Sequence, residues 1–326
     1  MLQFRRRVYP DNDRAGDDAH FRWRFLRTAG ADTSPRAPFT LLAVEGDEIL
    51  GQWAGIDDRV WAGGRTWPVT WMVDLVVAPE HRDTMAAMAL MREAVTAGRT
   101  LLATGVPARL LPFYEVFRWR RIPVGGSFYA VCRPRPLVDL AHAGDADSPA
   151  TPKLPAAVRT LLPLSDRLLP LLRRARSAMI PGRGSVELLP AVPDAADGLF
   201  HRLRELLAPT PVFDAAALRW KLEARPCGRH ELLGLPGAGG QLRGLAVLKL
   251  RRRPGVAGWG EVAAILVHPE DGPGFHRLLG GVEERAHRHD LDFLRLRCSV
   301  PALQRRLRPP WWLRRDRPPI TDLFLH

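Results

Sequence analysis

The stretch from Trp71 to Val95 restricts the fold most, because it predicts a strand, a short turn and a helix in immediate succession. An apolar run ends at Val77-Ala78-Pro79-Glu80, a polar turn covers residues 81–84, and a helix opens at Met85. Unpaired backbone N–H groups and the helix dipole converge at such a helix start, which makes it an anion site. One carboxylate, Asp74, interrupts the apolar strand just upstream. The arrangement predicts group transfer from a phosphate-bearing carrier beside a carboxylate.

The same residues carry a family resemblance. The run from Leu75 to Arg82 resembles the signature L-x-V-x-P-x-x-[RQ]-x-x-G-x-[GA] of the GNAT superfamily of acyl-CoA-dependent N-acyltransferases. Arg82 takes the [RQ] position and Ala87 the final [GA] position, whereas Met85 replaces the middle glycine, where the backbone has to approach the pyrophosphate closely. By this resemblance the coenzyme-binding residues are Leu75, Val76, Val77, Arg82, Asp83, Thr84, Met85, Ala86 and Ala87.

A second motif lies downstream. The run from Leu111 to Trp119 resembles the family's C-terminal Y-E-x-x-G-F motif, with Arg118 in place of the glycine. Tyr114 falls on the tyrosine that protonates the departing thiolate in family members. The next apolar stretch, residues 125–131, is interpreted as the closing strand of the same domain, so the resemblance covers residues 1–135.

The resemblance implies that a substrate amine attacks the thioester of acetyl-CoA or another acyl-CoA. An alkyl ammonium group has a pKa near about 10.4, so at neutral pH it has to lose a proton first. Asp74 is the candidate base, directly or through a water molecule. Two structural roles stay open beside these: Asp74 as a carboxylate paired with an arginine, and Tyr114 as a core aromatic residue.

The chain is strongly basic, with a formal net charge of +13 over 326 residues. This charge favours anionic partners such as coenzyme A, an acidic acyl-carrier protein or nucleic acid. Because no helix-turn-helix, zinc-finger or RNP-like run is present, no nucleic-acid partner is expected. The expected partner is a small-molecule amine, with an acyl-carrier protein as an alternative donor.

The cysteines and the apolar runs bear on metal binding and location. Cys132, Cys227 and Cys298 lie far apart without zinc-ligand spacing, and His287 to Asp290 is interpreted as a capped helix end, so no metal is expected. The charged N-terminus is not followed by an apolar core, and no apolar run approaches about 18 residues. The expectation is a cytoplasmic protein without a membrane span.

A weak repeat divides the chain. Arg22-Trp23-Arg24 recurs as Arg219-Trp220-Lys221, and Val77 to Glu80 recurs as Val267 to Glu270, with a similar order of strands and helices around each. The expected fold is α/β, with two tandem GNAT-like domains, each a mixed central sheet flanked by helices. The expected domains are 1–135, which is catalytic, a helical linker over 136–184, and 185–326, which is degenerate and either structural or substrate-shaping.

The two copies differ where chemistry is expected. Alignment of the repeated motifs places Ala264 opposite Asp74 and Gly272 opposite Arg82, and the second copy has no tyrosine in its short helix. The expected function is therefore transfer of an acyl group, acetyl in the first place, from coenzyme A to an unidentified amine by the first copy. The alternative is a non-catalytic acyl-CoA-binding or scaffold protein of the same fold.

Overall fold

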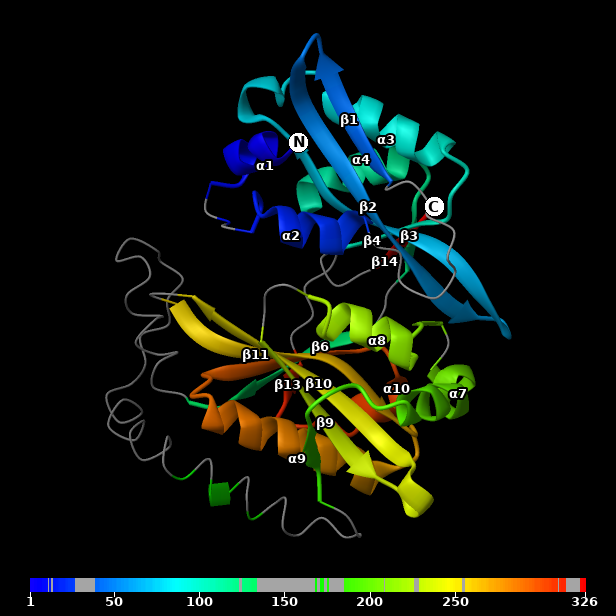
Figure 1. Cartoon of the computed structure of the whole chain (residues 1–326), viewed down its shortest axis with the longest axis vertical. Helices are drawn as coiled ribbons and strands as arrows, with labels where there is room; N and C mark the ends of the chain where they lie inside the picture. Colours follow the sequence, from blue (N-terminus) through cyan, green and yellow to red (C-terminus); the bar gives the residue numbers. More distant parts are fainter. Residues whose placement is uncertain are drawn as a thin grey trace. The chain divides into compact units, whose positions relative to one another are not determined.

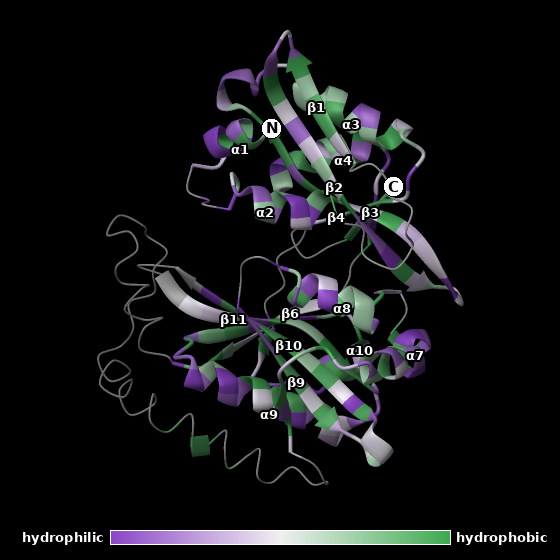
Figure 2. Ribbon diagram, in the orientation of Figure 1, coloured by the Kyte–Doolittle hydropathy of each residue, from purple (hydrophilic) through white to green (hydrophobic). Residues whose placement is uncertain are grey.

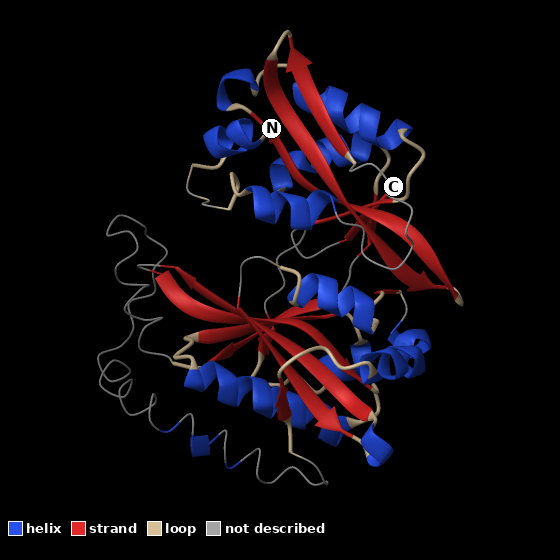
Figure 3. Cartoon of the chain, viewed as in Figure 1, coloured by secondary structure: helices blue, strands red, loops and turns tan. Residues whose placement is uncertain are grey.

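The fold is taken from a computed structural model, and it divides the chain into two units (Figure 1). The structure describes residues 1–10, 12, 14–26, 39–122, 125–133, 168, 171–172, 175, 185–207, 209–225, 229–253, 256–309, 311–314 and 323–326. The first unit comprises Met1–Val124, Leu207–Cys227 and Arg317–His326; the second comprises Gly125–Leu206 and Gly228–Asp316. Each unit contains a mixed sheet with helices beside it, as Figure 3 shows in red and blue.

The sheet of the first unit combines strands from distant parts of the sequence. Its order is β1 (Thr40–Glu45), β2 (Glu48–Ala62), β3 (Arg65–Val77), β4 (Leu101–Thr104), β14 (Leu323–Leu325) and β5 (Arg120–Ile122), with β8 (Thr210–Pro211) paired to β2. Only β3 and β4 run parallel among these pairs. The helical elements are α1 (Leu2–Val8), α2 (Asp18–Phe21), the π-helical turn η1 (Arg22–Leu26), η2 (Pro79–His81), α3 (Ala86–Thr96), η3 (Ala108–Leu110), α4 (Leu111–Val116) and α8 (Ala215–Leu222).

The helix α3 follows directly from its sequence pattern. Ala86, Leu90, Met91 and Ala94 recur on one side and are buried, while the polar residues between them are exposed. This buried side contributes to a core that also includes Trp53 of β2 and residues of β3, β4, α4 and β14. Figure 2 shows the apolar residues in green along the strands and on the helices beside them. The parallel β3–α3–β4 connection is therefore held by apolar burial.

The second unit has a sheet of similar form. Its order is β13 (Leu313–Arg314), β6 (Gly126–Val131), β12 (Phe293–Cys298), β11 (Val256–Val267), β10 (Leu242–Arg253), β9 (Arg229–Pro236) and β7 (Glu187–Leu189). The helical elements are α7 (Ala195–Leu207), η4 (Ala238–Gly240), α9 (Gly272–Arg288) and α10 (Pro301–Gln304). Phe275, Leu278, Leu279 and Val282 of α9 are fully buried against the sheet. The predicted fold class, two mixed sheets flanked by helices, is confirmed.

The strands divide between the units differently from the sequence-based interpretation of residues 125–131. That segment forms β6, which pairs with β12 of the second sheet over the whole range from Phe293 to Cys298. The position that it was expected to fill belongs to β14, the C-terminal strand, which lies between β4 and β5. Strand pairing depends on which sheet edges are open in space, and sequence order does not reveal that. The predicted linker, 136–184, lies outside the described residues except at 168, 171, 172 and 175.

None of the helices in the described part of the chain is both long enough and apolar enough to cross a bilayer.

Candidate functional site

A bulge in β3 positions the Asp74 carboxylate. Gln52 pairs with Val76 and Ala54 pairs with Val73, so two residues of β3, Asp74 and Leu75, lie opposite a single residue of β2. Asp74 has a φ of 55°, a left-handed conformation that aspartate tolerates better than most residues other than glycine. A bulge bends the strand and changes the direction of its side chains. The carboxylate is therefore displaced from the regular alternation of β3.

The edge of β3 that faces β4 is open beyond the bulge. The parallel pairing of the two strands comprises Thr70 with Leu101 and Trp71 with Leu102. Beyond these pairs β3 continues to Val77, whereas β4 ends at Thr104. Within the described residues, the segment from Met72 to Val77 thus has a strand partner on the β2 side alone. Backbone N–H and C=O groups along such an edge are available to an extended ligand.

The turn after β3 leads into the exposed first turn of α3. The residues from Arg82 to Met85 are all exposed, and the Thr84 hydroxyl accepts a hydrogen bond from the Ala86 N–H at 3.3 Å. The remaining N–H groups of the first turn of a helix have no intrahelical partner. Met85 is 70% exposed and has a φ of −77°, which any residue adopts. Its side chain therefore extends outward, and the backbone at this position does not need a glycine.

Two arginines hold the Asp74 side chain. Arg5 Nη2 lies 3.0 Å and Arg24 Nη1 lies 3.1 Å from the same oxygen, Oδ2. The second oxygen, Oδ1, takes part in neither ion pair. Arg5 comes from α1 and is 3% exposed, and its Nε donates to the Ala15 carbonyl at 3.1 Å. Asp74 is thus a paired carboxylate, as one of the two sequence-based interpretations expected, and one of its oxygens is left for a further contact.

Tyr9 adds a hydroxyl to the surroundings of Asp74. Burial and the negative charge of Asp74 raise its pKa to about 12, against the opposing effect of Arg5 and Arg24. The hydroxyl is accordingly protonated at neutral pH. Neither of the two arginines nor Tyr9 was identified from the sequence as a neighbour of Asp74. These residues are far from Asp74 along the chain, and Arg5 is 69 residues away.

Tyr114 lies in the core of the first unit. Its side chain is 4% exposed on α4, and its ring lies 4.9 Å from the ring of Trp119 and 5.1 Å from that of Phe324. Burial raises the pKa of Tyr114 far above its ordinary value, so the hydroxyl keeps its proton. Among the described residues, no hydrogen bond joins Tyr114 to Asp74. The structure therefore places Tyr114 as a packed aromatic residue, the second role that the sequence left open, with a proton to donate.

The repeated tryptophans pack against each other. The rings of Trp23 and Trp220 stack at 5.7 Å, and Trp23 Nε1 donates to the Trp220 carbonyl at 2.9 Å. Beside this contact, an open pocket of about 320 Å³ is lined by Arg22, Trp23, Leu26 and Ala224.

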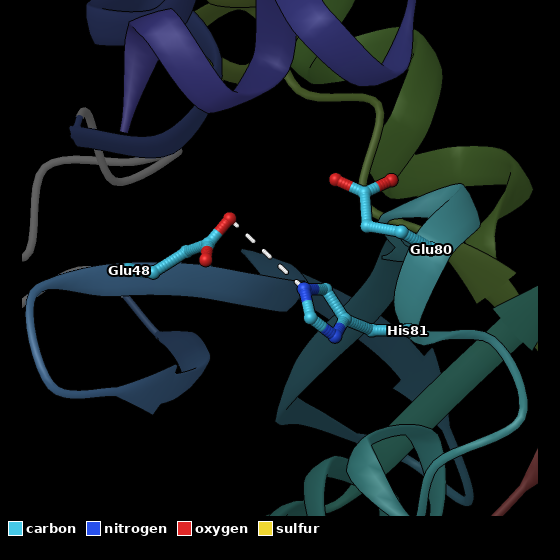
Figure 4. Close-up of side chains that lie close together, drawn as sticks. All are labelled: Glu48, Glu80 and His81. Carbon is cyan, nitrogen blue, oxygen red and sulfur yellow. Dashed lines mark ion pairs between the residues drawn. The ribbon is translucent and has the colours of Figure 1, made fainter.

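A cluster of three potential metal ligands lies at the start of β2 and in η2. Glu48, Glu80 and His81 direct their side chains toward one another in Figure 4. Arg7, however, lies 3.0 Å from Glu48 and 3.5 Å from Glu80, and His81 Nε2 lies 4.0 Å from Glu48. A guanidinium group is already paired with both exposed carboxylates. The cluster is a surface ion-pair network, of a kind that contributes little to stability.

The second unit differs at the corresponding place. Its helix α9 is capped by its own carboxylate: Asp271 accepts a hydrogen bond from the Gly274 N–H at 2.9 Å and two from Arg243 at 2.6 Å. Burial alone would raise the pKa of Asp271, but the hydrogen bonds from Arg243 and from the Gly274 N–H, together with nearby positive charge, outweigh it and lower the pKa. The anion position at this helix start is thus filled by Asp271 itself. The pairing of the neighbouring strands β11 and β12 comprises Trp259 to Val262, and β11 continues to Val267, as β3 continues beyond its pairs with β4 in the first unit.

Comparisons with known proteins found one matching family model and several solved structures of similar fold. Residues 1–122 match the family model described as an acetyltransferase (GNAT) domain. No curated protein matches the chain. A solved GCN5-related N-acetyltransferase from Anabaena variabilis is similar with a TM-score of 0.56 and 12% identity, covering 88% of this chain and 62% of that one. The Saccharomyces cerevisiae N-myristoyltransferase, solved with bound myristoyl-CoA, has a TM-score of 0.50 and 10% identity, covering 85% and 66%. The chain thus spans less than two thirds of either structure, and these likenesses concern the fold.

Proposed function

We propose that this chain, whose residues 1–122 match a family model described as an acetyltransferase (GNAT) domain, is an acyltransferase that moves an acyl group, acetyl in the first place, from coenzyme A to an amine. The observation that carries the proposal is the open edge of β3, which runs from the bulge at Asp74 into the exposed first turn of α3. This one segment offers a position for the extended thioester arm and one for the anionic pyrophosphate of the donor. It also carries the carboxylate of Asp74. We also propose that the protein is cytoplasmic.

The donor would bind along the segment from β3 to α3. Backbone groups of Leu75, Val76 and Val77 would pair with the amides of the pantetheine arm, as an added strand does at a sheet edge. The pyrophosphate would lie at the helix start, where N–H groups and the helix dipole favour negative charge. The residues proposed to hold it are Arg82, Asp83, Thr84, Met85, Ala86 and Ala87. The outward course of the Met85 side chain leaves the backbone of the first turn accessible.

The chemistry would need a proton acceptor and a proton donor. Asp74 Oδ1 would take the proton from the substrate amine, directly or through water. The amine nitrogen then forms a bond to the thioester carbonyl carbon, the bond from this carbon to sulfur breaks, and the nitrogen releases its second extra proton to solvent. The Tyr114 hydroxyl, which is protonated at neutral pH, would donate a proton to the leaving thiolate. Solvent would return the proton from Asp74 to Tyr114, so that the cycle balances.

A non-catalytic acyl-CoA-binding protein is the second candidate. It is favoured by the two arginines on Asp74 and by the burial of Tyr114, since both residues have a structural role without any turnover. An acyl-carrier protein is an alternative donor, because its acidic surface would be attracted to a chain with a net charge of +13.

The test combines binding with turnover. Calorimetric titration of the full chain with coenzyme A and acetyl-CoA measures donor binding, and thiol release in the presence of a panel of amines measures transfer. We expect binding of both donors and thiol release that depends on an amine. Binding without any amine-dependent release would favour the non-catalytic candidate, and no binding of either donor would refute the proposal.

A further inference from the structure

Arg5 is a buried cation with an unused donor. Its Nη2 is paired with Asp74 and its Nε with the Ala15 carbonyl, but its Nη1 is buried without a hydrogen-bond partner among the described residues. The rings of Tyr9, Phe21 and Phe25 surround the guanidinium group, with centroids 5.6, 5.9 and 5.3 Å from its central carbon. Aromatic faces attract such a cation but do not replace a hydrogen-bond acceptor. An unsatisfied buried donor of this kind is costly, and it calls for an acceptor.

The charges around Asp74 are unbalanced. Arg5 and Arg24 contribute two positive charges, and Asp74 contributes one negative charge to the same cluster. Two neighbouring titratable groups add no charge at neutral pH. Burial, together with the charge of Arg24, lowers the pKa of His20 to about 4, and the pKa of Tyr9 is raised to about 12. The cluster thus carries one net positive charge, and it attracts a negatively charged group of a ligand.

A second buried polar group lies on the neighbouring strand. Gln52 of β2 is 0% exposed, and both its amide nitrogen and its amide oxygen lack a hydrogen-bond partner among the described residues. It pairs with Val76, two residues along β3 from Asp74. Buried amides are almost always hydrogen-bonded in native proteins, so an unpaired one next to the bulge is a further indication of a polar ligand.

We infer that the acceptor carries a carboxylate close to its amine, as an amino acid does; this inference rests on the proposed function. Arg5 Nη1 and the guanidinium group of Arg24 bind the carboxylate, since the planar fork of arginine matches carboxylate geometry. Asp74 Oδ1, which neither ion pair uses, contacts the ammonium group and receives its proton. The cluster therefore contains a partner of opposite charge for each charged group of a zwitterion.

The experiment compares matched acceptors. Thiol release is measured with amino acids, with their α-amides and with the corresponding decarboxylated amines, on the full chain with acetyl-CoA. We expect kcat/KM for the best amino acid to exceed that for its amide by about tenfold or more, the effect of a lost charge-assisted hydrogen bond. Arg24→Gln should abolish this preference. Arg22→Gln removes an exposed charge of the same helical element, which is paired with Asp18, and it should leave the preference intact.

A binding measurement separates this inference from the proposed function. Calorimetry with the same amino acids and amides is carried out without coenzyme A, on the wild type, Arg24→Gln and Arg5→Lys. Tighter binding of the amino acid, lost in Arg24→Gln, supports the inference even if no transfer is observed. Equal affinity for amino acid and amide overturns it, even if other amines are acylated. Arg5→Lys keeps the charge and removes the fork, and the Arg24→Gln arm decides the result if Arg5→Lys does not fold.

Discussion

At the scale of single residues, Asp74 combines three features that are rarely found together. It has a left-handed φ of 55°, it lies in a bulge, and two arginines share one of its oxygens. The left-handed conformation and the ion pairs hold the carboxylate in one position, and only one of its oxygens is engaged. A carboxylate held this way can be structural, catalytic or both, and substitution distinguishes these roles.

The first prediction concerns Asp74→Asn, which keeps the shape and removes the charge. Turnover should fall by about 10²- to 10⁴-fold if the carboxylate is the base. The free energy of unfolding should also fall, by about 1–3 kcal/mol, because Arg5 remains buried with a weaker partner. Asp57→Asn is the matched control, since Asp57 is paired with Arg99 at 3.0 Å on the same sheet. Loss of stability in both variants with turnover retained in both would show that Asp74 is structural.

The second prediction concerns Tyr114→Phe, which removes one hydroxyl from a ring packed between Trp119 and Phe324. We expect turnover to fall by about 10²- to 10⁴-fold while the affinity for coenzyme A changes little, because only the proton donor is lost. Steady-state kinetics and calorimetry measure the two quantities. Tyr129→Phe, on β6 of the second unit, is the control. Unchanged turnover in Tyr114→Phe would assign the residue to the core alone.

At the scale of elements, the turn between β3 and α3 is the proposed phosphate site. Arg82→Ala removes an exposed cation from this turn and should weaken coenzyme A binding by about 1–3 kcal/mol at low salt, the scale of a charge-assisted hydrogen bond. Arg92→Ala, an exposed arginine in the body of α3, should have little effect. Equal dissociation constants for wild type and Arg82→Ala would mean that the arginine faces solvent and does not contact the phosphates.

The C-terminal strand β14 has a position in the first sheet that was not predicted from the sequence. It pairs with β4 on one side and with β5 on the other, and its Phe324 is 3% exposed against Tyr114. Phe324→Ala should lower the free energy of unfolding by about 3–5 kcal/mol through the cavity that it leaves. Leu313→Ala, at a site that is 48% exposed on β13, should cost much less. Urea denaturation compares the two, and equal costs would show that β14 is not part of the folded core.

At the scale of the whole molecule, the two units have similar sheets but different helix starts. The first turn of α3 is exposed, whereas α9 is capped by Asp271, itself bound by Arg243. We therefore expect coenzyme A to slow backbone hydrogen exchange in residues 72–87 and to leave residues 259–275 unchanged. Hydrogen exchange followed by mass spectrometry measures both segments in one sample. Protection of the second segment would contradict the assignment of the donor to the first unit.

Local pattern was enough to predict the strand, turn and helix from Trp71 to Val95, and with them the fold class of the chain. Those features follow from apolar spacing, proline position and helix starts, which involve residues close together in sequence. Asp74 was also found this way, because a carboxylate inside an apolar strand stands out. Its bulge could not be predicted, since the register of two strands depends on both partners.

The tertiary structure alone decided which side chains surround Asp74 and which strands complete each sheet. Arg5 and Arg24 reach Asp74 from the N-terminal helices, and β14 and β6 take positions that their place in the sequence does not suggest. Ion pairs and strand pairs form between whatever groups the folded chain brings together, and closing a long loop costs little more than closing a short one. The sequence therefore determined the elements and one candidate carboxylate, while long-range packing decided that carboxylate's charge environment.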